Sequence, residues 1–393
     1  MLTKTVSKSF AGIVLICALL SLFKFNHCRV NDWQSPDNYV HACYTDIPAL
    51  FSERGLDTNS FAYLSPTNSI EYPPVIGLGN WLISFITPDT NSYRWFFDIN
   101  AVILIALFLI SALIVRKIRP EYGYLFPLAP AVIASLFINW DLWAVVSAML
   151  AIYYFDKRRY EISAIALGVS IATKFFPLVL LLPITIILYR SAAIDQLRKY
   201  LTTTLLFWLV INLPIMATHF AGWWRFFKLN LERSADFGSL WYGLSLLGID
   251  IPFLNLIYLI ITTASFIALA IYLLNLKQIP NLAQCALFAV VIFTTFSKVY
   301  SPQYVLWLTP LAVIALTKSV QQIYFWIWQV SEIIYHLAIW QYLAQYSGAS
   351  FGLPAGGYAI ATLLRIVAIT GFTYLLMRDL SAKSTAQMSV ISR

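Results

Sequence analysis

The segment FDINAVILIALFLISALIVRKIR, residues 97–119, decides the fold. Its central part, 99–115, carries no charged side chain and is long enough to cross the apolar core of a bilayer as a helix. Asp98 precedes this part, and three basic residues follow it: Arg116, Lys117 and Arg119. Because basic residues gather on the cytoplasmic side of membrane proteins, the pattern predicts a transmembrane helix whose C-terminal end faces the cytoplasm.

The composition extends this prediction to the whole chain. Hydrophobic residues make up 60% of the 393 residues and charged residues only 11%, whereas charged residues make up about 25% of a soluble domain. The mean hydropathy is +0.73. A chain of this length holds roughly a dozen spans of about 20 residues with short connections. We therefore expect an all-α, polytopic membrane bundle in which residues 1–393 form one integral membrane domain.

About twelve apolar runs are predicted to be transmembrane helices. They cover residues 8–24, 97–115, 124–140, 142–155, 161–175, 176–189, 199–217, 253–274, 282–296, 303–317, 321–340 and 357–377. The short run 74–87 is interpreted as a helix on the outer surface, because a crossing there would move the basic cluster after residue 115 to the outer face. With this choice both termini are cytoplasmic.

Two long polar segments, 25–96 and 218–252, are then outside, and most of the carboxylates lie on that face. Carboxylates contribute little to topology, so their gathering there calls for another explanation, and chemistry at the outer face is one. The net charge of +8 comes from basic residues scattered in ones to threes beside apolar segments. This scatter is typical of membrane topology and does not predict a nucleic-acid-binding surface.

The cysteine and histidine spacings favour no metal site. Cys28 and Cys43 flank the first polar stretch, where a disulfide and two free thiols are both open interpretations. No C-x-x-C pair occurs. The histidines lack a ligand spacing such as H-x-x-x-H; they are His27, His41, His219 and His336.

The first polar segment holds the leading candidate for a general base. In TDIPALFSERG, residues 45–55, either Thr45 or Asp46 can cap a short helix that Gly55 ends. Capping alone would explain the aspartate, but a carboxylate fixed at a helix start beside a bilayer is also well placed to accept a proton. IEYPP, residues 70–74, offers a further carboxylate and a phenol, or simply a rigid turn with an interfacial tyrosine.

Cations occur at outer turns, against the positive-inside pattern. Lys174 and Lys298 are each followed by an apolar run, and Asp141 lies in another tight turn. Such lysines can snorkel, but several that face a common space would suit a phosphate. The second outer segment adds further charges, Arg233 and Asp236 among them.

Two charged residues and one histidine fall in the interior of predicted spans, away from the span ends. Glu332 and His336 are four residues apart and share a helix face, and Arg365 lies in the last span. Such groups either line a cavity or pair with each other inside the bundle.

Six motifs together resemble the polytopic glycosyltransferases of family eighty-seven, the alpha-mannosyltransferase-like group. In chain order they are CYTDIPALFSERGL (43–56), IEYPPVIG (70–77), NWDLWAVV (139–146), ATKFFPLVLLLP (172–183), RSADFGSLWY (233–242) and SPQYVLWLTPLAVIA (301–315). The resemblance implies a GT-C type of membrane bundle whose first outer loop carries short juxtamembrane helices and an acidic general base. Asp46 matches that base best, but no adjacent acidic pair occurs in the loop, so Glu71 and Asp37 stay alternatives.

The resemblance further implies an inverting transfer from a polyprenyl-phosphate-linked sugar, often mannose, to a lipid or glycan acceptor. Cofactors and metals are not expected, since cationic side chains can stabilise an anionic leaving group. Asp46 is the expected catalytic residue. The expected substrate-binding residues are His41, Arg54, Glu71, Tyr72, Asp141, Lys174, Arg233, Asp236, Lys298, Tyr304, His336 and Arg365.

Two other functions are weighed against this one. A transporter or flippase for a lipid-linked sugar would share the spans, a lipid groove and phosphate-binding cations. A scaffold protein in envelope synthesis would have no turnover at all. Carboxylates concentrated on one face fit a one-sided enzyme better than alternating access.

Overall fold

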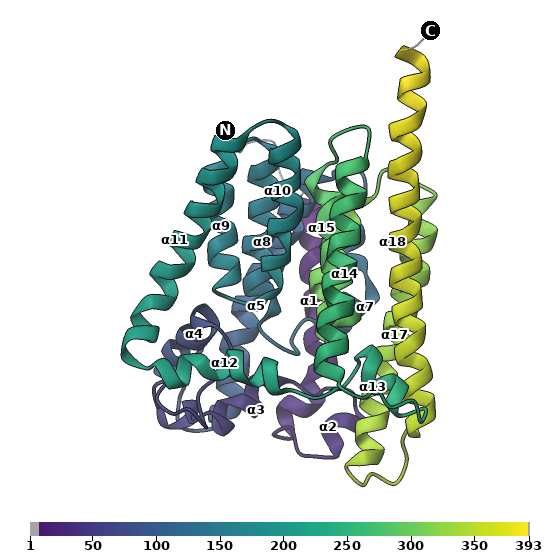
Figure 1. Ribbon diagram of the computed structural model, residues 1–393. Helices are drawn as coiled ribbons and strands as arrows, with labels where there is room; N and C mark the ends of the chain where they lie inside the picture. The colour runs from purple at the N-terminus through teal and green to yellow at the C-terminus, as the bar shows by residue number, and fades with distance from the viewer. Residues whose placement is uncertain (1–7, 392–393) are drawn as a thin grey trace.

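The computed structural model describes residues 8–391, and this part of the chain is helical without a β-strand. The upright helices of the bundle labelled in Figure 1 are α1 (Lys8–Val30), α5 (Ser92–Ile118), α7 (Pro130–Ser135), α8 (Asp141–Asp156), α9 (Tyr160–Ile171), α10 (Leu181–Arg190), α11 (Ile194–Thr218), α14 (Leu254–Asn275), α15 (Leu282–Phe296), α17 (Gln321–Tyr346) and α18 (Ala355–Ile391). Two further helices belong to the bundle: α6 (Leu125–Leu128) contacts α7, and α16 (Val305–Ala315) packs against α15. Short 3₁₀ helices, η2 (Phe176–Leu180) and η3 (Pro302–Tyr304), lead into α10 and α16.

A layer of short helices covers one end of this bundle, the lower end in Figure 1. It contains α2 (Asp37–Val40), α3 (Asp46–Glu53), η1 (Leu56–Thr58), α4 (Pro74–Ser84), α12 (Phe220–Glu232) and α13 (Leu240–Ser245). These helices belong to the two long polar segments of the sequence. α1 begins and α18 ends at the opposite end of the bundle.

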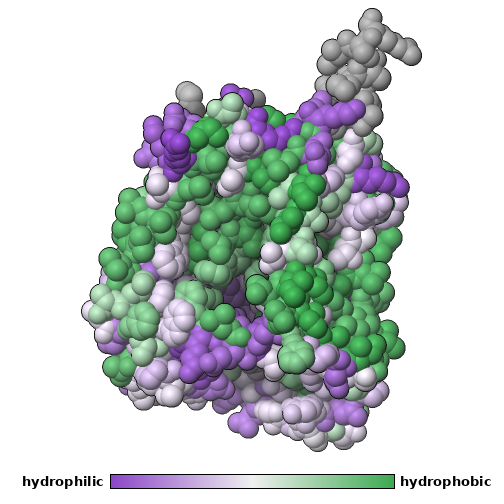
Figure 2. All heavy atoms as spheres, viewed as in Figure 1, coloured by the Kyte–Doolittle hydropathy of each residue, from purple (hydrophilic) through white to green (hydrophobic). Residues whose placement is uncertain are grey.

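The outer surface of the bundle is apolar. Figure 2 shows a broad hydrophobic belt between two polar edges, with a hollow in the belt close to its lower edge. Large apolar side chains on α11 and α14 are more than half exposed, among them Leu205, Val210, Leu256 and Ile260. Exposed apolar area of this extent suits contact with lipid.

Each predicted span overlaps a helix, and five helices are long and apolar enough to cross a membrane: α1, α5, α11, α14 and the part of α18 over Ala355–Ala382. The count of about twelve crossings stays a prediction. The range 124–140, expected as one helix, is divided into α6 and α7. Ala129 has extended backbone angles between them, because the residue before a proline, here Pro130, is pushed out of the α region.

The run 74–87 forms α4, whose 11 residues span roughly 16 Å at 1.5 Å per residue, about half the apolar thickness of a bilayer. α4 lies in the layer of short helices (Figure 1), and its place at the outer membrane surface stays a prediction. A Cβ atom at Gly77 would collide with the Tyr63 hydroxyl, and one at Gly79 would lie 2.7 Å from the Trp143 ring. The two glycines therefore let α4 pack closely against its neighbours.

A disulfide joins Cys28 at the end of α1 to Cys43, with the Cα atoms 5.8 Å apart. Cys17 and Cys285 are buried free thiols. The sequence left a disulfide and two free thiols both open for Cys28 and Cys43, and the structure contains the disulfide. It fixes the segment that leads into α3 against the bundle.

Candidate active site

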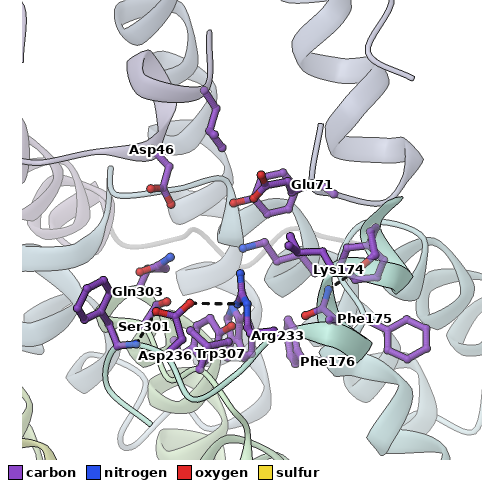
Figure 3. A pocket seen from close by; sticks show the side chains of 18 of the residues that line it. Asp46, Glu71, Lys174, Phe175, Phe176, Arg233, Asp236, Ser301, Gln303 and Trp307 are labelled. Atoms are coloured by element: carbon purple, nitrogen blue, oxygen red, sulfur yellow. Dashed lines mark hydrogen bonds and ion pairs between the residues drawn. The ribbon is translucent and has the colours of Figure 1, made fainter. Parts of the chain in front are cut away.

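A cavity of about 360 Å³ lies between the layer of short helices and the bundle, and Figure 3 shows it from close by. Its polar lining residues are Tyr44, Asp46, Glu53, Arg54, Glu71, Tyr72, Lys174, Asn230, Arg233, Asp236, Ser301, Gln303 and Tyr304. Its apolar lining includes Phe175, Phe176, Phe226, Leu229, Phe293 and Trp307. The cavity thus combines charged groups of both signs with an aromatic wall.

The start of α3 presents Asp46 to this cavity. The Thr45 hydroxyl accepts a hydrogen bond of 3.2 Å from the Ile47 amide and so caps the helix, which leaves the Asp46 carboxylate free for other contacts. Thr45 Oγ1 also donates to the Phe137 carbonyl at 2.7 Å, and the Asp46 amide donates to the Ile138 carbonyl at 2.8 Å. These bonds attach α3 to the chain just before α8.

Asn139 connects three polar groups of the cavity. Its Nδ2 donates to Asp46 Oδ2 and to the Tyr72 hydroxyl, both at 2.6 Å. Its Oδ1 accepts from Lys174 Nζ at 3.2 Å. Burial raises the pKa of Asp46 to about 6, although the hydrogen bonds from Asn139 and Tyr44 and the charge of Lys174 lower it in part. A carboxyl with this pKa is largely ionised at neutral pH and can still take up a proton.

Lys174 is held by a carboxylate behind the cavity wall. Its Nζ donates to Asp141 Oδ1 at 2.8 Å, and Asp141 also accepts from the Trp307 indole. Asp141 is fully buried and does not line the cavity. An ammonium group has three donors, so these bonds to Asn139 and Asp141 leave Lys174 one N–H for a ligand.

The opposite wall comes from the second outer segment and from η3. Arg233 Nε lies 3.6 Å from Asp236 Oδ2, the ion pair drawn in Figure 3. Tyr304 stacks on Trp307 with ring centroids 3.7 Å apart, and Trp307 stacks on Phe176 at 4.1 Å. Stacked rings of this kind can bind the face of a sugar or an apolar chain.

Glu71 joins the first outer segment to α12. Its Oε1 accepts from Arg54 and, at 3.1 Å, from Arg225 Nη2. Arg225 also donates to the Thr67 carbonyl. The two long polar segments are therefore tied together beside the cavity by one carboxylate and two guanidinium groups.

Eight of the thirteen predicted site residues line the cavity: Asp46, Arg54, Glu71, Tyr72, Lys174, Arg233, Asp236 and Tyr304. Asp141 contacts it through Lys174. The other four lie elsewhere, and their predicted binding roles are not supported by this placement. Lys298, for example, donates to the Leu231 carbonyl at 3.0 Å and to Asn255 Oδ1 at 2.8 Å.

Arg365 and His336 are buried among protein groups. Arg365 donates to the carbonyls of Gly238 and Tyr300, and its guanidinium lies 3.6 Å from the Glu332 carboxylate. Of the two roles considered for ionisable groups inside the spans, Arg365 therefore has the one of pairing within the bundle and does not line a cavity. His336 Nε2 accepts from the indole of Trp340, four residues on, at 3.0 Å. His41 lies at the protein surface beside Asp37.

Sequence reasoning missed Asn139. The residue stands in the NWDLW motif, in which the sequence points to Asp141 as the functional residue. Its position two residues before a turn carboxylate was the available signal. Its role depends on α3 and the segment just before α4 lying against this turn across more than 60 residues, which local sequence does not specify.

No family model matches the chain, and no curated protein matches it. Among solved structures, the chain is similar to ArnT from Cupriavidus metallidurans bound to undecaprenyl phosphate, with 13% sequence identity and a TM-score of 0.48. The alignment covers 96% of this chain and 78% of the ArnT chain. This likeness is too distant to assign an activity, and the resemblance to family eighty-seven stays a prediction.

Proposed function

We propose that this chain is a membrane glycosyltransferase that moves a sugar, mannose in the first instance, from a polyprenyl-phosphate donor to a lipid or glycan acceptor of the cell envelope. One observation carries the proposal. The Asp46 carboxylate, whose pKa burial raises to about 6, faces the same cavity as Lys174 and Arg233. A base and cations around one space are what the transfer of a phosphate-linked sugar requires.

In the proposed reaction the acceptor hydroxyl attacks the anomeric carbon, and its proton passes to Asp46. The bond between the anomeric carbon and the phosphate oxygen breaks, and the electron pair stays on the departing polyprenyl phosphate. That group gains one negative charge, which the remaining N–H of Lys174 and the guanidinium of Arg233 stabilise. Attack opposite the leaving group inverts the anomeric centre. The reaction needs no cofactor, because the donor is already activated.

Other lining groups suit the sugar and the lipid. Asp236 and Gln303 offer hydrogen-bonding groups to sugar hydroxyls, and the stacked rings of Tyr304 and Trp307 offer an apolar face. The phenylalanines at the start of η2 and on α12 suit the first isoprene units of the donor. We place the cavity at the outer face of the cell membrane, with both termini in the cytoplasm.

The test measures transfer of radiolabelled mannose from polyprenyl-phosphate-mannose to extracted envelope lipids and glycans by the purified chain. Asp46→Asn should lower the rate by about 10²–10⁴-fold while donor binding persists. Asp57→Asn is the matched control, because Asp57 is an exposed carboxylate of the same loop that does not line the cavity. Full activity of Asp46→Asn would contradict the assignment of the base.

A second assay covers the case in which neither protein transfers label. This assay measures movement of the lipid-linked sugar across vesicle membranes. If the wild type and Asp46→Asn both move the lipid without covalent transfer, the enzyme proposal is overturned in favour of a transporter. Transfer by the wild type with another polyprenyl-linked sugar would keep the reaction and correct the substrate.

A further inference from the structure

Three potential metal ligands from the first outer segment lie together, away from the cavity. His27 Nε2 is 2.7 Å from Asp37 Oδ2, and His41 Nδ1 is 3.0 Å from Asp37 Oδ1. With one ligand atom taken from each residue, the three atoms lie within 4.8 Å of one another. None of these residues lines the cavity that contains Asp46. Each oxygen of one carboxylate therefore has an imidazole nitrogen beside it.

We propose that His27, Asp37 and His41 bind one divalent transition-metal ion, with Zn²⁺ as the expected ion. Two imidazole nitrogens and a carboxylate oxygen form a ligand set that suits zinc, copper(II) or nickel(II) better than magnesium or calcium. A tetrahedral zinc ion with bonds of about 2.0–2.1 Å has neighbouring ligand atoms about 3.3 Å apart. His27 and His41 lie beside different oxygens of Asp37, at 2.7 and 3.0 Å, so a small rotation of the side chains brings one carboxylate oxygen and both nitrogens around one ion. The ion would replace two weaker contacts of 3.2 Å, between Asn31 Nδ2 and His27 Nε2 and between His41 Nδ1 and the Asp37 carbonyl.

The local fold brings these ligands together. Cys28 directly follows His27, and Cys43 comes two residues after His41. The disulfide between the two cysteines therefore holds the two histidines near each other. Asp37 and His41 are at the two ends of the single turn α2. A chain that is already constrained loses less conformational freedom when it binds an ion. The spacing of fourteen residues between the histidines gave no sequence signal, because the turn and the disulfide create the cluster.

The site has room to adjust and to admit solvent. The side chains of His27 and Asp37 are 38% exposed and that of His41 is 45% exposed. The imidazole rings stack with centroids 3.7 Å apart, so the exposed His41 ring must turn outward slightly for both nitrogens to meet one ion. Water can supply the fourth ligand on the exposed side. An ion here would tie the end of α1 to α2, just ahead of α3 and Asp46.

The test titrates Zn²⁺ into the full chain, purified with a tag that contains no histidine and stripped of metals with a chelator, in a calorimeter. We expect one equivalent to bind with at least micromolar affinity and the melting temperature to rise with Zn²⁺. His27→Ala and His41→Ala should each weaken binding by tenfold or more. His219→Ala is the matched control, since His219 contacts Thr218 and lies outside the cluster.

Cu²⁺ provides a spectroscopic readout that does not depend on activity. Electron paramagnetic resonance of the Cu²⁺ complex should show two coordinating nitrogens in wild type and one in either alanine variant. Binding that is equal in wild type and both variants, or no saturable binding below millimolar Zn²⁺, would overturn the proposal. It does not rest on the proposed glycosyl transfer, so the two can fail separately.

Discussion

Asn139 donates a hydrogen bond of 2.6 Å to the carboxylate of Asp46, and this bond joins the turn before α8 to the first turn of α3. Asp46 is the only partner of Asn139 that is proposed to change its protonation state during the reaction. The bond favours the ionised carboxylate and so opposes the effect of burial, which raises the pKa of Asp46 to about 6. Asn139 is therefore a positioning residue for the proposed base.

Replacement of Asn139 by alanine should shift the pH dependence of transfer. The proposed base works only when ionised, so kcat/KM should fall as the pH drops through about 6 in wild type. Loss of the Asn139 hydrogen bond raises the pKa of Asp46 further, and the midpoint should move to higher pH. The variant should accordingly lose more activity at pH 6 than at pH 8. A purely structural defect would lower the rate equally at both, which would contradict this role.

Lys174→Met should destabilise the protein by about 3–5 kcal/mol, because it leaves Asp141 buried without its cation. Methionine keeps a chain of similar length, so lost packing is a minor part of the expected effect. Thermal unfolding in detergent measures the change. Addition of Asp141→Asn should restore most of the stability, since the neutral side chain can still accept from the Trp307 indole.

The same pair of variants separates stability from binding. The double variant lacks the cation that we assign to the donor phosphate, so it should stay inactive although it is stable. A double variant that is as unstable as Lys174→Met would show that the ion pair is not what holds this region together. A stable and fully active double variant would remove Lys174 from the proposed mechanism.

The Cys28–Cys43 disulfide determines how many free thiols can be labelled before and after reduction. Under denaturing conditions without reductant, a maleimide should label two cysteines, Cys17 and Cys285, and four after reduction. Reduction should lower the free energy of unfolding by about 3 kcal/mol, the value expected for a closed loop of this size, here with a sequence separation of 15. Four labelled thiols in the unreduced protein would contradict the bond.

The positions of the helices follow from the sequence because apolar runs are local features. The range 97–115, for example, lies wholly within α5, and the first polar segment contains the expected short helices. The helices α12 and α13 of the second polar segment were not predicted. The exception at 124–140 also has a local cause, since Pro130 forces Ala129 out of the helical conformation and so divides the run. Turn signals around Thr45 and Gly55 similarly located the ends of α3.

The candidate site was only partly predictable, because a sequence gives the depth of a side chain in the membrane but not the direction in which it points. Lys174 and Lys298 have similar sequence contexts at outer turns. Lys174 lines the cavity, whereas the ammonium group of Lys298 donates its hydrogen bonds to a backbone carbonyl and an asparagine side chain outside the cavity. Arg365 likewise stacks between the rings of Tyr300 and Tyr335 deep in the bundle. Such choices depend on long-range packing.

The orientation of the bundle is open to direct measurement. Asp89 and Glu121 are exposed and lie at the two ends of α5, so cysteines placed there report opposite sides of the membrane. In a background with serine at Cys17 and Cys285, an impermeant maleimide added to whole cells should label Asp89→Cys but not Glu121→Cys. Lysis should make both accessible, which controls for reactivity. The expectation rests on the basic residues at the end of α5, which favour the cytoplasm. Labelling of Glu121→Cys alone would show that α5 has the opposite orientation, and the cavity with its proposed base would then be on the cytoplasmic side.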